Sequence, residues 1–352
     1  MTNQEEARYN RHIILPEIGM EGQEKLKKAS VFVLGAGGLG CPALLYMTAA
    51  GIGRIGIADF DVIDESNLQR QVLYTTVDIG LSKAAQAKEK LQLLNPFLTI
   101  EAHQVKITSD NILELLKDYD IVVDGSDNFA TRYLVNDACV ILNKPLVFGS
   151  IFKFEAQVSV FNYQNGPTYR CLYPEPPKEG EVPNCSEVGV IGVLPGIAGS
   201  LQANEVIKII TGIGEVLSGK LLMFDALSMA FNTISFRLLP ENKNIKELID
   251  YDVFCGVEKA KHISAKELKS KIEQADNFQL IDVRNEDEFE RFNIGGKLIP
   301  LPELEERKKE ISIENEVVII CKSGMRSAAA VAILNKYGYS KAWSLEGGLD
   351  KY

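Results

Sequence analysis

Short apolar runs alternate along the chain with stretches of helical spacing, and this alternation predicts an α/β fold. Residues 31–34 form a buried run, a glycine-rich turn follows, and residues 42–50 continue as a helix that ends at Gly51. Residues 54–58 form the next apolar run, so the opening is a strand–helix–strand unit. Further helices are expected at 82–94, 111–118, 132–142 and 196–211, and further strands at 98–105, 120–127 and 145–150.

Two segments of this first part depart from the alternation. Residues 154–161 alternate apolar and polar side chains, which predicts a half-exposed, antiparallel strand and therefore a mixed sheet. Residues 167–192 are rich in proline, glycine and charge, which predicts a long loop of the kind that often carries function.

The apolar periodicity fades over residues 241–262, and a second α/β pattern begins at Ile263. Its helices are expected at 267–273, 286–292 and 325–337, and its strands at 278–284, 316–321 and 342–345. We therefore predict domains at 1–240 and 263–352, joined by a linker at 241–262. The second domain, at about 90 residues, is long enough to hold its own core.

Composition narrows the class of protein. The 352 residues are 46% hydrophobic and 24% charged, as in a soluble globular protein. No apolar run reaches the ~18 residues that a membrane helix needs, and the charged N-terminus does not resemble a signal peptide, so we expect a cytoplasmic protein. With a net charge of −10 and no dense cluster of Lys or Arg, neither nucleic acid nor a membrane is an expected partner.

The glycine-rich turn predicts a nucleotide site. Gly35, Gly37 and Gly40 fit G-x-G-x-x-G between a strand and a helix, with Gly38 as an additional glycine. Glycines let the backbone approach a phosphate, which then meets the helix N-terminus. Asp59 ends the next strand, where a carboxylate accepts hydrogen bonds from ribose hydroxyls.

The glycines do not separate NAD from ATP, so other residues must decide. Arg and Lys side chains at predicted strand and helix ends could bind a triphosphate, and a carboxylate there could bind Mg²⁺. The polar residues at these ends are Asp61, Asn67, Arg70, Lys83, Asp127 and Asn128. The histidines, His12, His103 and His262, are not placed for hydride-transfer chemistry. The pattern favours ATP over NAD.

Several motifs together resemble the ThiF/MoeB/HesA family, the bacterial relatives of the ubiquitin-activating enzymes. They are RYNRHIILPEIG, GAGGLG, DFDVIDESNLQRQ, DIGLSKA, DGSDNFATRYLVND and GSLQANEVIKIITG, in order over about residues 8–240. The resemblance implies a Rossmann-like, ubiquitin-activating-type domain with a mixed sheet. It implies that ATP and Mg²⁺ contact the polar residues above, with Asp127 as the Mg²⁺ ligand.

The resemblance also implies the reaction and the partners. The C-terminal glycine of a ubiquitin-like sulfur carrier ending in Gly-Gly attacks the α-phosphate, which gives an acyl adenylate and pyrophosphate. A homodimer is implied, in which Arg11 reaches the partner subunit's phosphates. The carrier could serve molybdopterin, thiamine or another sulfur pathway.

The six cysteines form no C-x-x-C pair, so each is judged by its neighbours. Some family members carry a Cys at the position of Cys185 that forms a thioester or a persulfide-linked intermediate with the carrier, whereas others do not require it for adenylation. The resemblance implies the covalent role for Cys185. Many members hold zinc through two C-x-x-C pairs, but this chain keeps only Cys171 and Cys255 of the four, so we predict no structural zinc. Cys41 and Cys139 lie on apolar helix faces and are expected in the core.

Cys321 ends a buried strand and leads through Lys322-Ser323-Gly324-Met325-Arg326-Ser327 into a helix. Converging backbone N–H groups and nearby cations favour a sulfur anion at that position. With LIDVRNEDEF and LEGGLDKY, this loop resembles rhodanese over about residues 263–352. The resemblance implies that Cys321 carries a persulfide assisted by Arg326, supplied by a donor such as a cysteine desulfurase. Asp282 and Arg284 are then supporting residues.

One departure concerns packing beside the loop. The chain has Asn293-Ile294-Gly295-Gly296 where many rhodaneses have His-Ile-x-Gly-Ala.

The sequence as a whole predicts an enzyme that adenylates a sulfur carrier and then transfers sulfur from Cys321 to form a thiocarboxylate. An NAD-dependent oxidoreductase and a non-catalytic scaffold that binds the carrier are the alternatives.

Overall fold

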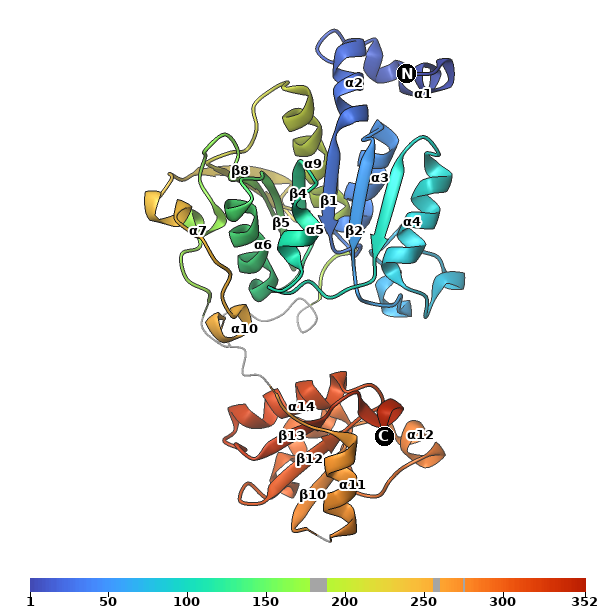
Figure 1. Cartoon of the computed structure of the whole chain (residues 1–352), viewed down its shortest axis with the longest axis vertical. Helices are drawn as coiled ribbons and strands as arrows, with labels where there is room; N and C mark the ends of the chain where they lie inside the picture. The colour runs from blue at the N-terminus through green and yellow to red at the C-terminus, as the bar shows by residue number, and fades with distance from the viewer. Residues whose placement is uncertain (178–188, 256–259, 275) are drawn as a thin grey trace. The chain divides into compact units, whose positions relative to one another are not determined.

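The computed structural model describes residues 1–177, 189–255, 260–274 and 276–352. It divides into two compact units, Met1–Cys255 and Gly256–Tyr352, each with its own sheet (Figure 1). This division falls within the stretch 241–262 that the sequence predicts as a linker. Among the described residues, no helix is long and apolar enough to cross a membrane.

The first unit is built on an eight-stranded sheet in the order β3-β2-β1-β4-β5-β6-β7-β8. The parallel strands are β1 (Ser30–Leu34), β2 (Arg54–Ala58), β3 (Thr99–His103), β4 (Ile121–Asp124) and β5 (Leu146–Phe152). The antiparallel strands are β6 (Glu155–Phe161), β7 (Lys220–Asp225) and β8 (Ala230–Ser235). The predicted mixed sheet is therefore confirmed. Sequence analysis missed β7 and β8, because the exposed edge strand β8 carries no buried face that would set a period of two.

Helices cover both faces of this sheet (Figure 1). The long ones are α1 (Asn3–Ile13), α2 (Gly19–Lys28), α3 (Gly40–Ala50), α4 (Lys83–Leu94), α6 (Phe129–Ile141) and α9 (Val193–Thr211). The short ones are α5 (Ile112–Leu116), α7 (Tyr169–Leu172), α10 (Tyr251–Phe254) and the 3₁₀ turns η1 (Glu65–Asn67), η2 (Thr76–Asp78) and η3 (Pro240–Lys243).

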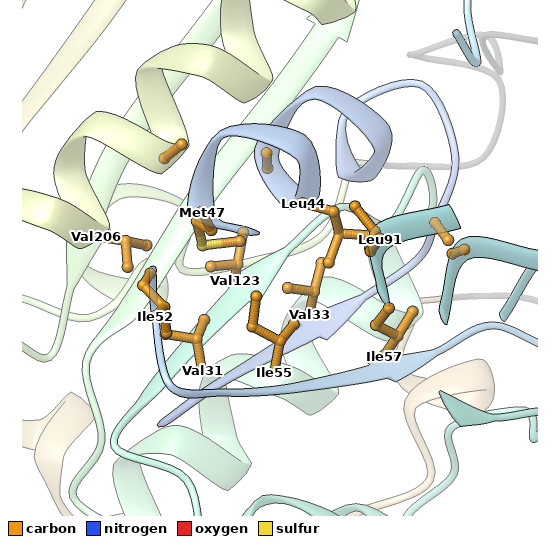
Figure 2. Packing of buried hydrophobic residues seen from close by; sticks show 14 of the residues in the cluster. Val31, Val33, Leu44, Met47, Ile52, Ile55, Ile57, Leu91, Val123 and Val206 are labelled. Atoms are coloured by element: carbon orange, nitrogen blue, oxygen red, sulfur yellow. The ribbon is translucent and has the colours of Figure 1, made fainter. Parts of the chain in front are cut away.

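Alternate residues of β1 point to opposite cores, as expected for a fully buried strand. Val31 and Val33 pack with residues of α3, α4 and α9 in one core, while Phe32 and Leu34 pack with residues of α5 and α6 in the other. Figure 2 shows the first core, in which Leu44 and Met47 of α3 pack against residues of β1 and β2. Two apolar faces hold the strand in place, so the turn that follows it is positioned firmly.

The strand order reverses between β1 and β4, which are neighbours in the sheet but distant in sequence. Loops diverge from such a reversal and leave a crevice at the carboxyl ends of the strands, where ligands bind in open α/β sheets. The glycine turn follows β1 and the Asp127–Asn128 loop follows β4, so both predicted binding segments meet there.

The second unit is a five-stranded parallel sheet in the order β11-β10-β12-β13-β9. Its strands are β9 (Lys261–Ile263), β10 (Phe278–Asp282), β11 (Lys297–Leu298), β12 (Glu316–Ile320) and β13 (Ala342–Leu345). Its helices are α11 (Ala265–Glu273), α12 (Glu286–Arg291), α13 (Leu304–Arg307) and α14 (Met325–Lys336), with 3₁₀ turns η4 (Leu301–Glu303), η5 (Lys308–Glu310) and η6 (Gly348–Lys351). The buried strand β12 ends at Ile320 and delivers Cys321 to the start of the loop before α14.

Candidate functional site

The glycine turn after β1 has room for backbone alone. Gly35 has a φ of +85°, a conformation that glycine adopts without strain. A Cβ at Gly40 would lie 1.9 Å from the Gly35 carbonyl oxygen, so the turn closes on itself only with glycine there. α3 begins at Gly40, directly after the turn, so the positive end of its dipole lies at the turn.

Three side chains fix the orientation of Ala36 within this turn. Its N–H donates to Asp59 Oδ2 at 2.8 Å, and its carbonyl accepts from Tyr74 Oη at 2.9 Å and from Cys41 Sγ at 3.2 Å. Burial raises the pKa of Cys41 to about 12, so its thiol remains a donor. The turn is thereby preorganised before any ligand arrives.

Asp59 follows β2 and lies half-buried beside the turn. Its second oxygen, Oδ1, accepts from the Asp61 N–H at 2.9 Å. Burial raises the pKa of Asp59 above its ordinary value, against the opposing effect of the two N–H donors. A carboxylate held rigidly at a strand end can accept hydrogen bonds from the hydroxyls of a bound ribose.

The two predicted phosphate cations reach the same crevice from different elements. Lys83 begins α4, is 6% exposed, and its Nζ lies 3.0 Å from Asp61 Oδ2. Arg70 follows η1, and its backbone N–H donates to the carbonyl of Asn67 at 3.1 Å. A Cβ placed on Gly38 would lie 3.7 Å from Arg70 Cδ, so the arginine borders the glycine turn.

The loop after β4 lies directly beside the glycine turn. A Cβ on Gly35 would lie 3.0 Å from the Gly125 carbonyl oxygen, which places these two backbones in contact. Asn128 caps α6 by accepting from the Thr131 N–H at 2.9 Å, and its Nδ2 lies 3.5 Å from Asp127 Oδ1. Asp127 is exposed, and its carboxylate is the kind of oxygen ligand that Mg²⁺ prefers.

Buried polar atoms without partners gather around this edge. In the described part of the chain they include Gln71 Oε1, Asp124 Oδ2, Ser126 Oγ, Arg132 Nε and Gln202 Oε1. Burial raises the pKa of Asp124, and the charge of Arg132 opposes that rise. Native structures rarely leave such atoms unpaired, so bound groups or ordered water would complete this edge. The fit to a nucleotide comes from the open glycine turn together with the half-buried Asp59 carboxylate and the Lys83 ammonium beside it.

Among the described residues that the sequence predicts for the site, Arg11 makes none of these contacts. Arg11 is exposed in the last turn of α1. Cys185 lies outside the residues that the structure describes. The core positions predicted for Cys41 and Cys139 are confirmed, since both are fully buried.

The region of the incomplete zinc motif is held by other contacts. Cys171 Sγ accepts from the N–H groups of Leu239 at 3.3 Å and Thr168 at 3.4 Å. Burial would raise the pKa of Cys171, but these hydrogen bonds together lower it. No group of three or more His, Cys, Asp or Glu could hold a metal ion within the described ranges.

Tyr251 of α10 hydrogen-bonds to a buried ion pair formed by Arg170 and Asp137. Arg170 Nε and Nη2 donate to the two oxygens of buried Asp137 at 2.8 and 2.7 Å, and Tyr251 Oη donates to Asp137 Oδ2 at 2.7 Å. Burial raises the pKa of Cys255 to about 11.

The loop of the second unit surrounds the sulfur of Cys321 with donors. Cys321 is fully buried, and its Sγ accepts from the N–H groups of Gly324 at 3.1 Å and Ser327 at 3.3 Å. Ser327 Oγ lies 3.4 Å from the same sulfur and 2.8 Å from Ser344 Oγ. Gly324 has a φ of +90°, which bends the backbone around the sulfur. This cradle can stabilise a sulfur anion at the N-terminus of α14.

Arg326 is fixed beside this cradle by an acidic partner. Its two terminal nitrogens donate to the carboxylate of Glu288 on α12 at 2.6 and 2.7 Å. The guanidinium lowers the pKa of Glu288 to about 2. Asp282 and Arg284, predicted as supporting residues, form a buried ion pair of 2.7 Å.

The sequence reasoning missed several residues of these sites. Tyr74, Asp124, Arg132 and Gln202 complete the first site, and Glu288 and Ser327 complete the second. Asp124 directly precedes the predicted loop at a strand end, so its position was available from the sequence. Gln202, which donates to the Asp124 carbonyl at 2.8 Å from α9, gave no local signal.

Comparison with known families gives two matches that follow the two units. The ThiF family model matches residues 9–246, and the rhodanese-like domain matches residues 264–352. The chain is 46% identical to the "Probable adenylyltransferase/sulfurtransferase MoeZ" of Mycobacterium tuberculosis, over 99% of this chain and 93% of the relative. It is 53% identical to the "Sulfur carrier protein adenylyltransferase" of Thermus thermophilus, covering 73% of this chain and 98% of the relative.

Solved structures resemble the chain as well. Escherichia coli MccB with ATP is 25% identical, with a TM-score of 0.59, and the match covers 66% of this chain and 72% of MccB. The complex of MccB with AMPCPP and MccA matches at 25% identity and a TM-score of 0.56, over 62% of this chain and 67% of that one.

Proposed function

This chain belongs to the ThiF family and ends in a rhodanese-like domain, and from that premise we propose that it adenylates a ubiquitin-like sulfur carrier and converts its terminus to a thiocarboxylate. It is an enzyme with adenylyltransferase and sulfurtransferase activities, and its adenylyltransferase substrate is ATP. The observation that carries the proposal is the convergence of the glycine turn, Asp59, Arg70 and Lys83 at one strand reversal.

In the first step, the turn and the N-terminus of α3 bind the phosphates, and Asp59 binds the ribose. A carboxylate oxygen of the carrier's C-terminal glycine attacks the α-phosphorus, and pyrophosphate leaves. Arg70 and Lys83 offset the negative charge that develops on the phosphate oxygens. Asp127 would hold Mg²⁺, which supplies electrostatic stabilisation of the leaving pyrophosphate when bound.

In the second step, the terminal sulfur of a persulfide on Cys321 attacks the acyl carbon, and AMP leaves. The product is an acyl disulfide that still joins the carrier to Cys321. A thiolate must attack the Cys321 sulfur to release the thiocarboxylate. We assign that role to Cys185, and a dithiol reductant then reduces the disulfide between Cys185 and Cys321.

The partners follow from these steps. The carrier ends in Gly-Gly, and a cysteine desulfurase is the class of enzyme that supplies persulfide sulfur. A homodimer in which Arg11 reaches the partner subunit's nucleotide accounts for a charged residue that has no role within its own site. Structural zinc is not part of the proposal, because the chain keeps only Cys171 and Cys255 of the four cysteine ligands that such a site needs.

The decisive experiment is carrier-dependent exchange of labelled pyrophosphate into ATP, with a panel of carriers ending in Gly-Gly. We expect exchange with one carrier and its loss in Arg70→Ala, while the matched variant Arg291→Ala, exposed in the second unit, retains it. ATP binding without exchange for any carrier would favour the scaffold alternative. NAD binding in preference to ATP would favour the oxidoreductase.

A further inference from the structure

The positive charge of Arg326, in the first turn of the helix that follows Cys321, is already paired with an acidic side chain. Both terminal nitrogens of Arg326 donate to Glu288, and the donors that contact the Cys321 sulfur come from the loop itself, from Gly324 and Ser327. The pKa of Arg326 is raised, first by its hydrogen bonds to Glu288 and, after the opposing effect of burial, by charges that include Cys321. Arg326 therefore lies within electrostatic reach of the sulfur while its hydrogen-bonding edge faces Glu288.

Glu288 is held in this position by the fold. Arg284 Nη1 donates to the Glu288 carbonyl at 3.2 Å and Nη2 donates to the Phe292 carbonyl at 2.7 Å, so one arginine binds the middle of α12 and its C-cap. Arg284 itself is 5% exposed and is bound by Asp282, which is fully buried. A buried ion pair thus anchors the helix that carries Glu288, and Glu288 reaches the catalytic loop from outside it.

The charges around the sulfur do not suit a doubly charged anion. The Glu288 carboxylate cancels the charge of Arg326, and the same helix carries Glu286, Asp287 and Glu290, all exposed. Lys322 is exposed in the loop. A dianionic donor would bring its charge close to the carboxylate of Glu288, and like charges that meet in an interface are strongly unfavourable.

We propose that Glu288 is a specificity-determining residue, which directs Cys321 toward alkyl persulfides and away from dianionic sulfur donors such as thiosulfate. The inference rests on the proposed function of Cys321 as a sulfur acceptor. The Cys321 thiolate attacks the outer sulfur of a donor R–S–SH, the donor's S–S bond breaks, and R–S⁻ leaves, so that Cys321–S–SH is formed. From thiosulfate the same attack would release sulfite and leave Cys321–S–S⁻.

The test compares two donors in the full chain and in Glu288→Gln. Thiosulfate and cysteine persulfide are used as donors with cyanide as acceptor, and kcat and KM are measured for each. We expect the ratio of kcat/KM for thiosulfate to that for cysteine persulfide to rise about tenfold in Glu288→Gln, mainly through a lower KM for thiosulfate. Glu288→Asp keeps the charge and should keep the wild-type ratio. Glu290→Gln removes an exposed charge from the same helix and should do the same.

A ratio unchanged in Glu288→Gln, or equal losses with both donors, would overturn the inference and leave Glu288 with a structural role. A salt titration of the unmodified protein provides a second measurement that does not depend on how the variant folds. Screening should raise the same donor ratio as ionic strength increases, and a ratio that stays level or falls contradicts the proposal. If neither donor loads sulfur on the unmodified protein, the proposed function of Cys321 fails instead.

Discussion

The glycine turn of the first unit and the Cys321 loop of the second share the same backbone construction but differ in how their polar groups are hydrogen-bonded. Each follows a buried parallel strand, bends through a glycine with positive φ and leads into a helix N-terminus. Around the glycine turn, buried polar atoms of Gln71, Asp124 and Arg132 lack partners, whereas the described residues of the second unit contain no such atom. The Cys321 sulfur, in contrast, already has two backbone donors.

The difference corresponds to how each site meets its substrate. A nucleotide arrives and leaves, so its site holds it through non-covalent contacts of the turn, Asp59 and the nearby cations. Sulfur remains covalently attached to Cys321, so the cradle can be complete beforehand, and its rigidity preorganises the anion. Substitutions at each site test whether the two sites act separately and which groups each one depends on.

Replacement of Cys321, which carries the persulfide, should have the largest effect. Cys321→Ala should abolish thiocarboxylate formation, because no other residue occupies the cradle, while pyrophosphate exchange continues at its normal rate. Mass spectrometry of the carrier terminus and the exchange assay measure the two activities separately. Ser323→Ala, at an exposed position in the same loop, is the control. A parallel loss of exchange would show that the two sites do not act independently.

A change at the nucleotide site should impair pyrophosphate exchange and leave persulfide loading of Cys321 intact. Lys83→Ala should lower carrier-dependent pyrophosphate exchange by about 10²–10³-fold, because a preorganised charge toward the phosphates is lost. Persulfide loading of Cys321 from cysteine persulfide should persist. The control is Lys88→Ala, on the exposed face of the same helix. Normal exchange in Lys83→Ala would remove Lys83 from the site.

The backbone packing of the glycine turn can be tested by a single methyl group. Gly40→Ala forces a Cβ against the Gly35 carbonyl oxygen and should destabilise the first unit by about 3 kcal/mol. Gly196→Ala in α9 meets no atom within 4 Å and should stabilise the protein, by up to about 1 kcal/mol. Thermal or urea unfolding measures both. Equal stability of the two variants would contradict the close approach described for Gly40.

The smallest effect on activity is expected from loss of the Ser327 hydroxyl, which lies beside the Cys321 sulfur. Ser327→Ala removes the hydroxyl near the Cys321 sulfur but keeps the backbone donors, so sulfur transfer should fall only about tenfold or less. Because Ser344 then loses its partner, the second unit should also lose about 1–3 kcal/mol of stability. A loss as complete as that of Cys321→Ala would show that the hydroxyl, rather than the backbone, holds the sulfur.

Much of each site could be predicted from local spacing. The G-x-G-x-x-G turn, Asp59 at the next strand end and the Cys321 loop all depend on residues close together in the chain, where periodicity and glycine placement act directly. Strand β8 could not be found in this way because it is almost wholly exposed, and β7 escaped because its buried residues, Leu221 and Phe224, are three positions apart and do not alternate. The position of α10 also escaped prediction, because Tyr251 is held by Asp137, more than a hundred residues away in sequence.

Local patterns in the sequence are enough to specify the two α/β units, the strand–turn–helix junctions and the residues at those junctions. The distant side chains that complete each site are set by tertiary packing. Gln202 reaches the end of β4 because α9 crosses the sheet there, and Glu288 meets Arg326 because Arg284 and Asp282 anchor α12 beside the loop. The physical reason is that backbone conformation responds to neighbours along the chain, whereas these partners are set by the order of the strands and the packing of helices on them.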